Sequence, residues 1–251
     1  MKAVVLAAGK GTRMGHLTVD RPKPMIEIGK RRILEHILFA IRDSGIREFI
    51  VVTGYFANLI EDHFGDGREF GMEMTYVRQE KIDGTGNALH LTRDLVGNET
   101  FFMSFGDIIT SIENYPRLIE TYRQRPCPAL LTLADVEDPC NGAAVYVDAD
   151  HRVQRIIEKP VRGTSTTDWN NAGIFIFDPV IFEYTAKLTP SPRGEYELTQ
   201  AIHHILADGK EVFGFPLSGH WGDIGTPEDV ERIMRVLDQP TDFTSPEATG
   251  R

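Results

Sequence analysis

The chain has 251 residues, enough for one sizeable hydrophobic core, with 41% hydrophobic and 25% charged residues. Its formal net charge of −10 excludes nucleic-acid binding through a broad basic face, although a local basic cluster can still bind a small anion. No run of about 18 apolar residues predicts a membrane span, and the first apolar run is too short for a signal peptide. The two cysteines form no CxxC pair, which argues against a disulfide framework or a zinc site and favours the reducing cytoplasm.

The first half of the chain alternates buried strands with helices. The predicted strands are Lys2–Ala7, Glu48–Thr53, Glu73–Arg78 and Thr100–Phe105, and the predicted helices are Arg31–Ser44, Asn58–Phe64, Thr85–Leu95 and Pro116–Arg125. Such alternation is typical of a parallel sheet with helices on both faces.

The pattern changes after residue 125. The predicted strands are then Pro128–Ala134, Ala143–Val147, Val153–Glu158 and Gly173–Phe177, and the helices are Glu197–Ala207 and Pro227–Leu237. We therefore predict one α/β domain over residues 1–238, a Rossmann-like three-layer sandwich with a mainly parallel central sheet. Its second half, residues 126–238, should be more antiparallel than residues 1–125. Residues 239–251 are polar and contain proline, and are predicted to form a disordered tail.

A glycine-rich loop follows the first strand and contains Gly9, Gly11 and Gly15. It does not match a Walker A loop, because Lys10 is followed by glycine and the earlier glycine of that motif is missing. A dinucleotide fingerprint fits poorly, since Gly15 stands one position late and no carboxylate ends the second strand. A glycine turn without a ligand is the remaining alternative.

Basic residues next to these glycines favour an anion site over a bare turn. Successive backbone N–H groups of a glycine loop can surround phosphate oxygens, and the Arg13 guanidinium can bind two oxygens at once. Lys23 stands between Pro22 and Pro24, which restrict the backbone around it. An exposed basic turn would not explain why these cations gather beside the glycines of an acidic chain.

Residues 7–25, AAGKGTRMGHLTVDRPKPM, resemble the opening of the sugar-1-phosphate nucleotidylyltransferases, also called nucleoside-diphosphate-sugar pyrophosphorylases. The resemblance implies that residues 1–125 bind the nucleotide and residues 126–238 the sugar. It makes Arg13 and Lys23 the catalytic residues. The nucleotide-binding residues that it implies are Ala7, Ala8, Gly9, Gly11, Thr12, Gln79, Gly84 and Thr85.

Two aspartates match the positions at which this family binds Mg²⁺ together with the nucleotide phosphates. Asp107 follows a buried strand, and Asp223 lies in the WGDIGTP segment, residues 221–227. One or two carboxylates with phosphate and water oxygens suit Mg²⁺. Without the resemblance, Asp107 reads equally well as an ordinary loop residue and Asp223 as a helix cap.

Later segments resemble the sugar-phosphate side of the family's site. The residues implied are Gly142, Glu158, Lys159, Asn171, Gly173 and Glu197. Lys159 would contact the phosphate, and the two glutamates would accept hydrogen bonds from sugar hydroxyls. The glycines would allow the backbone to approach the sugar ring.

We therefore predict Mg²⁺-dependent transfer of a nucleotidyl group from a nucleoside triphosphate to a sugar 1-phosphate. The amide of Gln79 offers both donors and an acceptor, which suits a pyrimidine, and a polar loop that caps the helix from Thr85 is an equally good interpretation. The resemblance favours UTP or dTTP over GTP, because guanylyl-transferring relatives tend to carry a different residue at this position. No histidine pair forms HExxH and no nucleophile elbow is present, which argues against covalent catalysis. The nature of the sugar and the oligomeric state stay open, and a homo-oligomer is compatible. The C-terminal β-helix of many relatives is not expected in so short a chain.

Two alternatives keep the same fold. A phosphocholine cytidylyltransferase-like enzyme would enclose a quaternary amine with aromatic residues such as Tyr146, Trp169 and Trp221. A catalytically silent subunit would only sense the nucleotide sugar. A dinucleotide-binding oxidoreductase is disfavoured by the missing acidic residue after the second strand.

Overall fold

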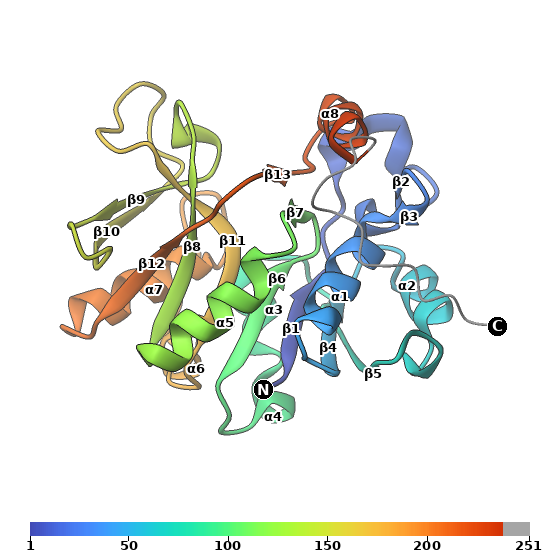
Figure 1. Ribbon diagram of the computed structural model, residues 1–251, viewed down its shortest axis with the longest axis horizontal. Helices are drawn as coiled ribbons and strands as arrows, with labels where there is room; N and C mark the ends of the chain where they lie inside the picture. The colour runs from blue at the N-terminus through green and yellow to red at the C-terminus, as the bar shows by residue number, and fades with distance from the viewer. Residues whose placement is uncertain (238–251) are drawn as a thin grey trace.

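One large mixed sheet forms the centre of the computed structural model, which describes residues 1–237; the tail predicted for residues 239–251 lies outside the described residues. The strands are β1 (Ala3–Leu6), β2 (Glu27–Ile28), β3 (Arg31–Arg32), β4 (Glu48–Thr53), β5 (Glu73–Arg78), β6 (Phe101–Phe105), β7 (Ile108–Thr110), β8 (Ala129–Asp135), β9 (Ala143–Val147), β10 (Val153–Glu158), β11 (Trp169–Phe177), β12 (Val212–Pro216) and β13 (Trp221–Asp223). The α-helices are α1 (Ile33–Asp43), α2 (Ala57–Phe64), α3 (Thr85–His90), α4 (Arg93–Val96), α5 (Asn114–Gln124), α6 (Ile181–Thr185), α7 (Leu198–Ala207) and α8 (Pro227–Leu237) (Figure 1).

The strand order is β10-β9-β11-β6-β1-β4-β5, with β8 beside β11 and β12 beside β8. The four strands β6, β1, β4 and β5 are parallel, and Val4 at the centre lies opposite Ile50 on one side and Met103 on the other. Val5 packs toward the core under α1 and α5, whereas Val4 packs toward the core under α3, α6 and α7. The predicted α/β sandwich with a parallel core is confirmed.

Parallel strands align their carboxyl ends along one edge of the sheet, where open α/β folds bind ligands. At this edge β1 leads into the glycine loop, β5 leads to Gln79, and β6 leads to Gly106 and Asp107. The parallel core therefore gathers predicted site residues that are far apart in the sequence.

The strands after β7 pair mostly antiparallel, because β11 runs antiparallel to β6, β8 and β9, and β9 to β10. The pairing of β11 with β8 shifts between Asn171 and Phe175. The Thr132 hydroxyl fills this irregularity by donating to the carbonyl of Ile174 at 2.9 Å. Gly173 has a φ of 83°, so the irregularity falls on a residue that tolerates a left-handed backbone.

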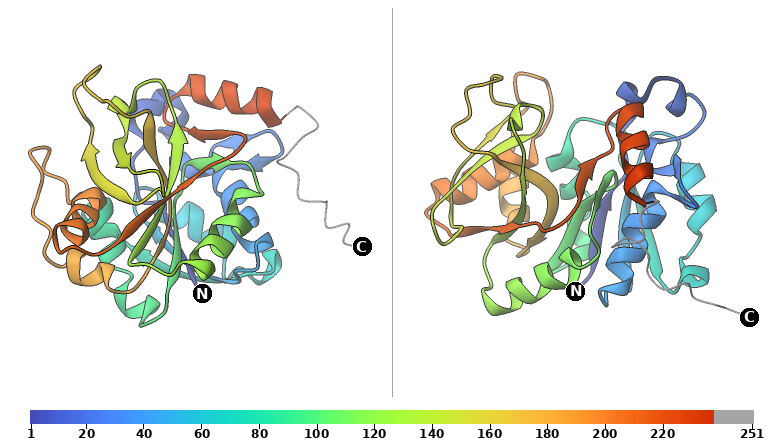
Figure 2. Two further views of the ribbon diagram at one scale, coloured as in Figure 1. Left: turned by 60° about the vertical axis from the view of Figure 1, so that its left-hand side comes forward. Right: turned by 45° about the horizontal axis from the view of Figure 1, so that its top comes forward.

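The end of the described chain returns to its beginning. After β13, α8 packs against β2 and the turn of residues Thr12–Thr18, and both views of Figure 2 show it beside the N-terminal segment. No helix within residues 1–237 combines the length and apolarity needed to cross a membrane.

Most predicted elements are confirmed, five of them residue for residue: Glu48–Thr53, Glu73–Arg78, Ala143–Val147, Val153–Glu158 and Pro227–Leu237. The single helix predicted over Thr85–Leu95 is wrong. The amide and hydroxyl of Thr92 both bond to the carbonyl of Leu89, which ends α3 before α4 begins. The sequence pattern predicted none of β7, β12, β13 and α6.

Candidate active site

The glycine loop folds back over Lys23. Gly11 has a φ of 62°, and a Cβ atom there would lie 2.9 Å from the Cβ of Lys23, so any side chain at this position would collide. The Thr18 hydroxyl donates to the carbonyl of Gly11 at 3.2 Å, and the Tyr55 hydroxyl donates to the carbonyl of Thr18 at 3.3 Å. The loop is thereby tied to the segment that follows β4.

Lys23 binds both aspartates that the sequence singles out. Its side chain is largely buried, its Nζ donates to Oδ2 of Asp107, and it lies 4.0 Å from Oδ1 of Asp223. Burial and the neighbouring Asp107 raise the pKa of Asp223 to about 6, against the opposing effect of Lys23 and Arg13. An ammonium group therefore sits between two carboxylates that repel each other.

This cluster fits a divalent cation. Oδ1 of Asp223 is buried and accepts no hydrogen bond within residues 1–237, so a carboxylate oxygen is available there. In the same part of the chain no group of three or more His, Cys, Asp or Glu side chains forms a complete metal site. Two carboxylates with further oxygens from phosphate and water are the arrangement that Mg²⁺ commonly uses.

Arg13 crosses from the glycine loop to the WGDIGTP segment. A Cβ atom on Gly225 would lie 3.3 Å from both terminal nitrogens of the Arg13 guanidinium, so this glycine leaves room for the side chain. Arg13 lines two adjoining cavities of about 390 and 570 Å³. It therefore stands where the two cavities meet.

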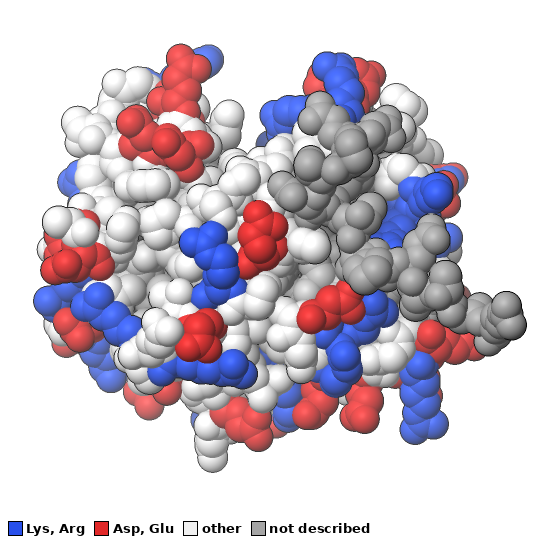
Figure 3. All heavy atoms as spheres, viewed as in Figure 1, with Lys and Arg blue, Asp and Glu red and all other residues white. Residues whose placement is uncertain are grey.

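The smaller cavity contains every residue predicted for nucleotide, catalysis and metal. The members are Ala7, Ala8, Gly9, Gly11, Thr12, Arg13, Lys23, Gln79, Gly84, Thr85, Asp107 and Asp223. The larger cavity contains every residue predicted for the sugar phosphate, namely Gly142, Glu158, Lys159, Asn171, Gly173 and Glu197. Figure 3 shows a hollow in the upper outline of the molecule, between the β9–β10 side and α8. Both of these sides contribute residues to the larger cavity.

Gln79 is buried at the end of β5. Its amide donates to Oδ1 of Asp83 at 3.3 Å and to the carbonyl of Gly84 at 3.2 Å. Gly84 has a φ of 122°, and a Cβ atom there would lie 2.5 Å from the backbone of Tyr196. Tyr196 in turn donates its amide to the carbonyl of Asp83 at 2.7 Å, which links the Gln79 loop directly to the segment that carries Glu197.

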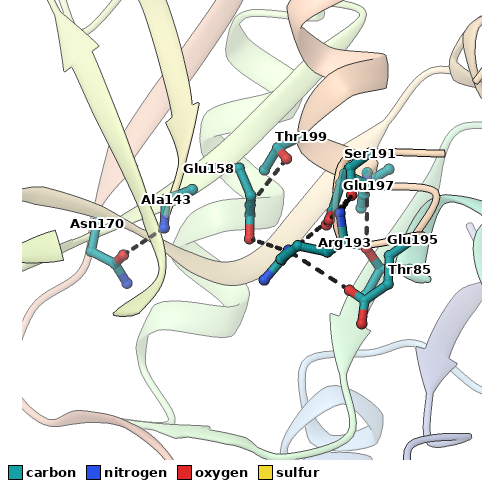
Figure 4. Close-up of polar contacts among 10 residues, drawn as sticks. Thr85, Ala143, Glu158, Asn170, Ser191, Arg193, Glu195, Glu197 and Thr199 are labelled. Carbon is teal, nitrogen blue, oxygen red and sulfur yellow. Dashed lines mark hydrogen bonds and ion pairs between the residues drawn. The ribbon is translucent and has the colours of Figure 1, made fainter. Parts of the chain in front are cut away.

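Arg193 holds three glutamates together in the larger cavity (Figure 4). Its Nη2 lies 3.3 Å from Glu158, 3.6 Å from Glu195 and 2.6 Å from Glu197. The Thr199 hydroxyl donates to the second oxygen of Glu158 at 3.0 Å. Burial and the nearby Glu197 raise the pKa of Glu158 despite this donor and Arg193.

Gly142 lets two strands approach each other closely. A Cβ atom there would lie 2.2 Å from Oδ1 of Asn170, the oxygen that accepts the amide of Ala143 at 3.0 Å. The Gly142 carbonyl accepts the amide of Lys159 at 2.8 Å, and Lys159 adopts a left-handed backbone with a φ of 42°. These contacts fix the backbone that presents the Lys159 side chain to the cavity.

Arg193 and Asn170 are site residues that the sequence prediction missed. The position of Arg193 in RGEYE, as the single cation among three acidic or hydrogen-bonding side chains, offered a signal. Asn170 stands next to the predicted Asn171. Its side-chain oxygen accepts the amide of Ala143 and so supports the loop of Gly142. Only the contact with a distant strand reveals its role.

A family model described as nucleotidyl transferase matches residues 2–239 of the chain. The chain belongs to this family. The resemblance to sugar-1-phosphate nucleotidylyltransferases, first carried by residues 7–25, is thereby confirmed.

Several relatives of this nucleotidyl transferase are known. It is 33% identical over 243 residues to the UTP–glucose-1-phosphate uridylyltransferase AglF of Haloferax volcanii, covering 96% of this chain and 98% of that one. It is 32% identical over 241 residues to a glucose-1-phosphate thymidylyltransferase of Streptomyces antibioticus, covering 94% of this chain but 66%, just under two thirds, of that one. A crystal structure described as a glucose-1-phosphate thymidylyltransferase from Bacillus anthracis with sucrose matches 98% of both chains at 28% identity, with a TM-score of 0.87.

The raised pKa of Asp223 predicts a pH-dependent stability difference. The folded value of about 6 lies above the ordinary 3.8, so the folded protein takes up a proton as the pH falls through this window. In EDTA, Asp223→Asn should therefore be more stable than the wild type at pH 8, and this advantage should shrink toward pH 5, as the wild-type carboxyl takes up its proton. Thermal unfolding at both pH values measures the difference.

Asp150→Asn is the control variant, because Asp150 lies in an exposed turn. Its effect on the unfolding temperature shows what the loss of one acidic charge does by itself. A difference between Asp223→Asn and the wild type that is the same at pH 8 and pH 5 would contradict the burial of an ionised carboxylate at this position.

Proposed function

We propose that this protein transfers a nucleotidyl group from a nucleoside triphosphate to a sugar 1-phosphate, with release of pyrophosphate. The observation that carries the proposal is a cluster of four charged side chains, which we call the junction. Lys23, Asp107, Asp223 and Arg13 all line the smaller cavity, and Arg13 and Asp223 also line the larger one. The names of the relatives, which are uridylyl- and thymidylyltransferases acting on glucose 1-phosphate, support the same reaction.

The main difficulty of this reaction is electrostatic. The phosphate oxygen of the sugar 1-phosphate is an anion at neutral pH and attacks the α-phosphorus without needing a general base. The two substrates repel each other, by about 1 kcal/mol for each pair of unit charges at 4 Å in water and by several times that in a dry site. Fixed cations and dipoles that act on the developing charge lower the barrier, as in other phosphoryl-type transfers.

The cations of the site divide this task according to their positions. The amides of residues 9–12 and the Arg13 guanidinium bind the β- and γ-phosphates, and Lys23 stabilises charge at the α-phosphate. Lys159, in the larger cavity, guides the incoming sugar phosphate. Holding both substrates in line across the junction supplies much of the remaining rate acceleration.

Asp107 and Asp223 would hold Mg²⁺, the cofactor that their carboxylate oxygens suit. When bound, this ion supplies positive charge to the phosphate oxygens. Carboxylates engaged in this way would no longer need Lys23 as their partner, so its ammonium would be available to the α-phosphate.

UTP or dTTP is the proposed nucleotide. Gln79 is held at the end of β5 by Asp83 and Gly84, so its amide has a fixed position in the smaller cavity. Its nitrogen donates to these two partners, so the amide oxygen is the atom that can accept the ring N–H of uracil or thymine. The unpaired cysteines Cys127 and Cys140 fit a cytoplasmic location for the reaction.

The alternatives receive less support from the positions of their residues. Of the aromatic residues considered for a choline cage, Trp221 lines the larger cavity, whereas Tyr146 stacks with Arg155 and Trp169 contacts His151. A silent sensing subunit would need none of the four charged residues at the junction, yet all four converge there.

Removing one charge at the junction should stop turnover without unfolding the protein. Arg13→Ala and Asp107→Asn are each expected to lower kcat by 10²-fold or more, because each group acts on charge that develops in the transition state. Pyrophosphate release under saturating substrates measures the effect, and circular dichroism checks the fold.

Arg21→Ala is the matched control, because Arg21 lies in the same loop region but pairs with Asp20 at the surface. It should leave kcat within about twofold of the wild type. Turnover like that of the wild type in Arg13→Ala or Asp107→Asn would remove that residue from the mechanism.

The choice of substrates is testable with a grid of five nucleoside triphosphates against a panel of sugar 1-phosphates and phosphocholine. We expect UTP or dTTP with a hexose 1-phosphate to give the highest kcat/KM with Mg²⁺. Productive reaction with CTP and phosphocholine would favour the choline alternative instead. A folded protein without any productive pair would favour the silent subunit.

A further inference from the structure

A short ribbon connects the two aspartates of the junction. Asp107 immediately precedes β7, and Asp223 is the last residue of β13, which pairs antiparallel with β7. Asp223 lies opposite Ile108, and the amide of Ile224 donates to the carbonyl of Asp107 at 3.0 Å. The relative position of the two carboxylates therefore depends on the register of this ribbon.

The ribbon is too small to hold its own register. It contains three residue pairs and forms a sheet separate from the large one. An isolated two-stranded pair is marginally stable at best in water. Other contacts must fix β13 against β7, particularly because Asp107 and Asp223 repel each other at one end.

Asn114, at the start of α5, supplies such contacts at the other end of the ribbon. Its side chain is almost fully buried, and its amide nitrogen donates to Oγ1 of Thr110 at 2.9 Å and to the carbonyl of Ser218 at 2.8 Å. Its amide oxygen accepts the amide and the hydroxyl of Ser218 at 3.0 and 3.2 Å. Both polar atoms of the side chain are thus used to join segments 104 residues apart.

Thr110 completes the connection. Its hydroxyl accepts from Asn114 and donates to the carbonyl of His220 at 2.7 Å, just before β13 begins. The backbone amide of Ser111 donates to the same carbonyl at 3.0 Å, while the Ser111 hydroxyl accepts the amide of His220 at 2.9 Å. Apart from the bond between Asn114 and Thr110, each of these bonds joins the β7 side of the ribbon to the β13 side.

We propose that Asn114 and Thr110 are positioning residues that lock the register of the β7–β13 ribbon, and thereby hold Asp107 and Asp223 around one cation. The inference rests on the proposed function, in which these aspartates bind the metal. Neither Asn114 nor Thr110 lines the two cavities of the site, so neither touches a substrate.

A buried hydrogen-bond network of this kind acts as a unit. Loss of one member leaves a desolvated carbonyl or hydroxyl without its partner, and the strands can then shift to find new ones. Groups that orient metal ligands from behind typically change metal affinity or activity by 10–100-fold when replaced. The effect should therefore reach the aspartates, although the altered residues lie at the far end of the ribbon.

The test compares Thr110→Val, which keeps the shape but loses the hydroxyl, with Thr110→Ser, which keeps the hydroxyl. Asn114→Leu removes the whole set of side-chain bonds. Thr92→Val is the control, because Thr92 is fully buried and loses one hydroxyl bond to Leu89 far from the ribbon. Binding of Mn²⁺ in the presence of α,β-methylene UTP is followed by the electron paramagnetic resonance signal of free Mn²⁺, together with kcat, KM and thermal unfolding.

Thr110→Val and Asn114→Leu should weaken Mn²⁺ binding and lower kcat by at least about 10-fold, with the KM of the nucleoside triphosphate within about threefold of the wild type. Thr110→Ser should restore both Mn²⁺ binding and kcat, and Thr92→Val should lower only the unfolding temperature. If Asn114→Leu does not fold, the two Thr110 variants decide the outcome.

The inference would be overturned if Thr110→Val and Asn114→Leu unfold at lower temperature but bind Mn²⁺ and turn over like the wild type, which is the result expected of the control Thr92→Val. A wild type that binds no Mn²⁺ would overturn it as well. A wild type that binds Mn²⁺ yet reacts with no sugar 1-phosphate contradicts the proposed function alone, since the Mn²⁺ comparison between the Thr110 variants still decides the positioning role.

Discussion

The repulsion between Asp107 and Asp223 is the constraint on which the site depends. The two carboxylates are brought together by β7 and β13, which are far apart in the sequence, and the ammonium of Lys23 offsets part of their repulsion. Burial and the remaining repulsion from Asp107 together raise the pKa of Asp223. A site that is strained without its ligands in this way is ready to accept a cation and a polyanion together.

The fold supplies this arrangement through two separate devices. The parallel strands β1 and β6 end at the same edge, and so place the glycine loop beside Asp107. The chain then forms the larger cavity, where Arg193 pairs with three glutamates, and β13 finally places Asp223 beside β7. The backbone bond between Tyr196 and Asp83 links the loop of Gly84, in the smaller cavity, to the segment of Glu197, in the larger cavity.

Much of this could be predicted from the sequence because the signals are local. Residues 3–25 contain a continuous apolar strand, the glycines next to it and a lysine between prolines. Strands such as Glu48–Thr53 are predicted from their apolar, β-branched composition. What the sequence could not provide depends on partners far along the chain. From the sequence, Asn114 is only a polar residue at the start of a helix. Its side-chain amide bonds to Ser218, more than a hundred positions later, and only the fold reveals this contact. The break in the Thr85–Leu95 helix likewise follows from a side-chain bond that helical periodicity does not encode.

The central claim, that Asp107 and Asp223 share one cation at the junction of the two cavities, is tested most directly by anomalous diffraction from crystals grown with Mn²⁺ and α,β-methylene UTP. The account predicts one strong manganese peak bonded to a carboxylate oxygen of each aspartate, with Lys23 turned toward the α-phosphate. A peak bonded to only one of the two aspartates, or a nucleotide bound with Lys23 still bridging both, would contradict it.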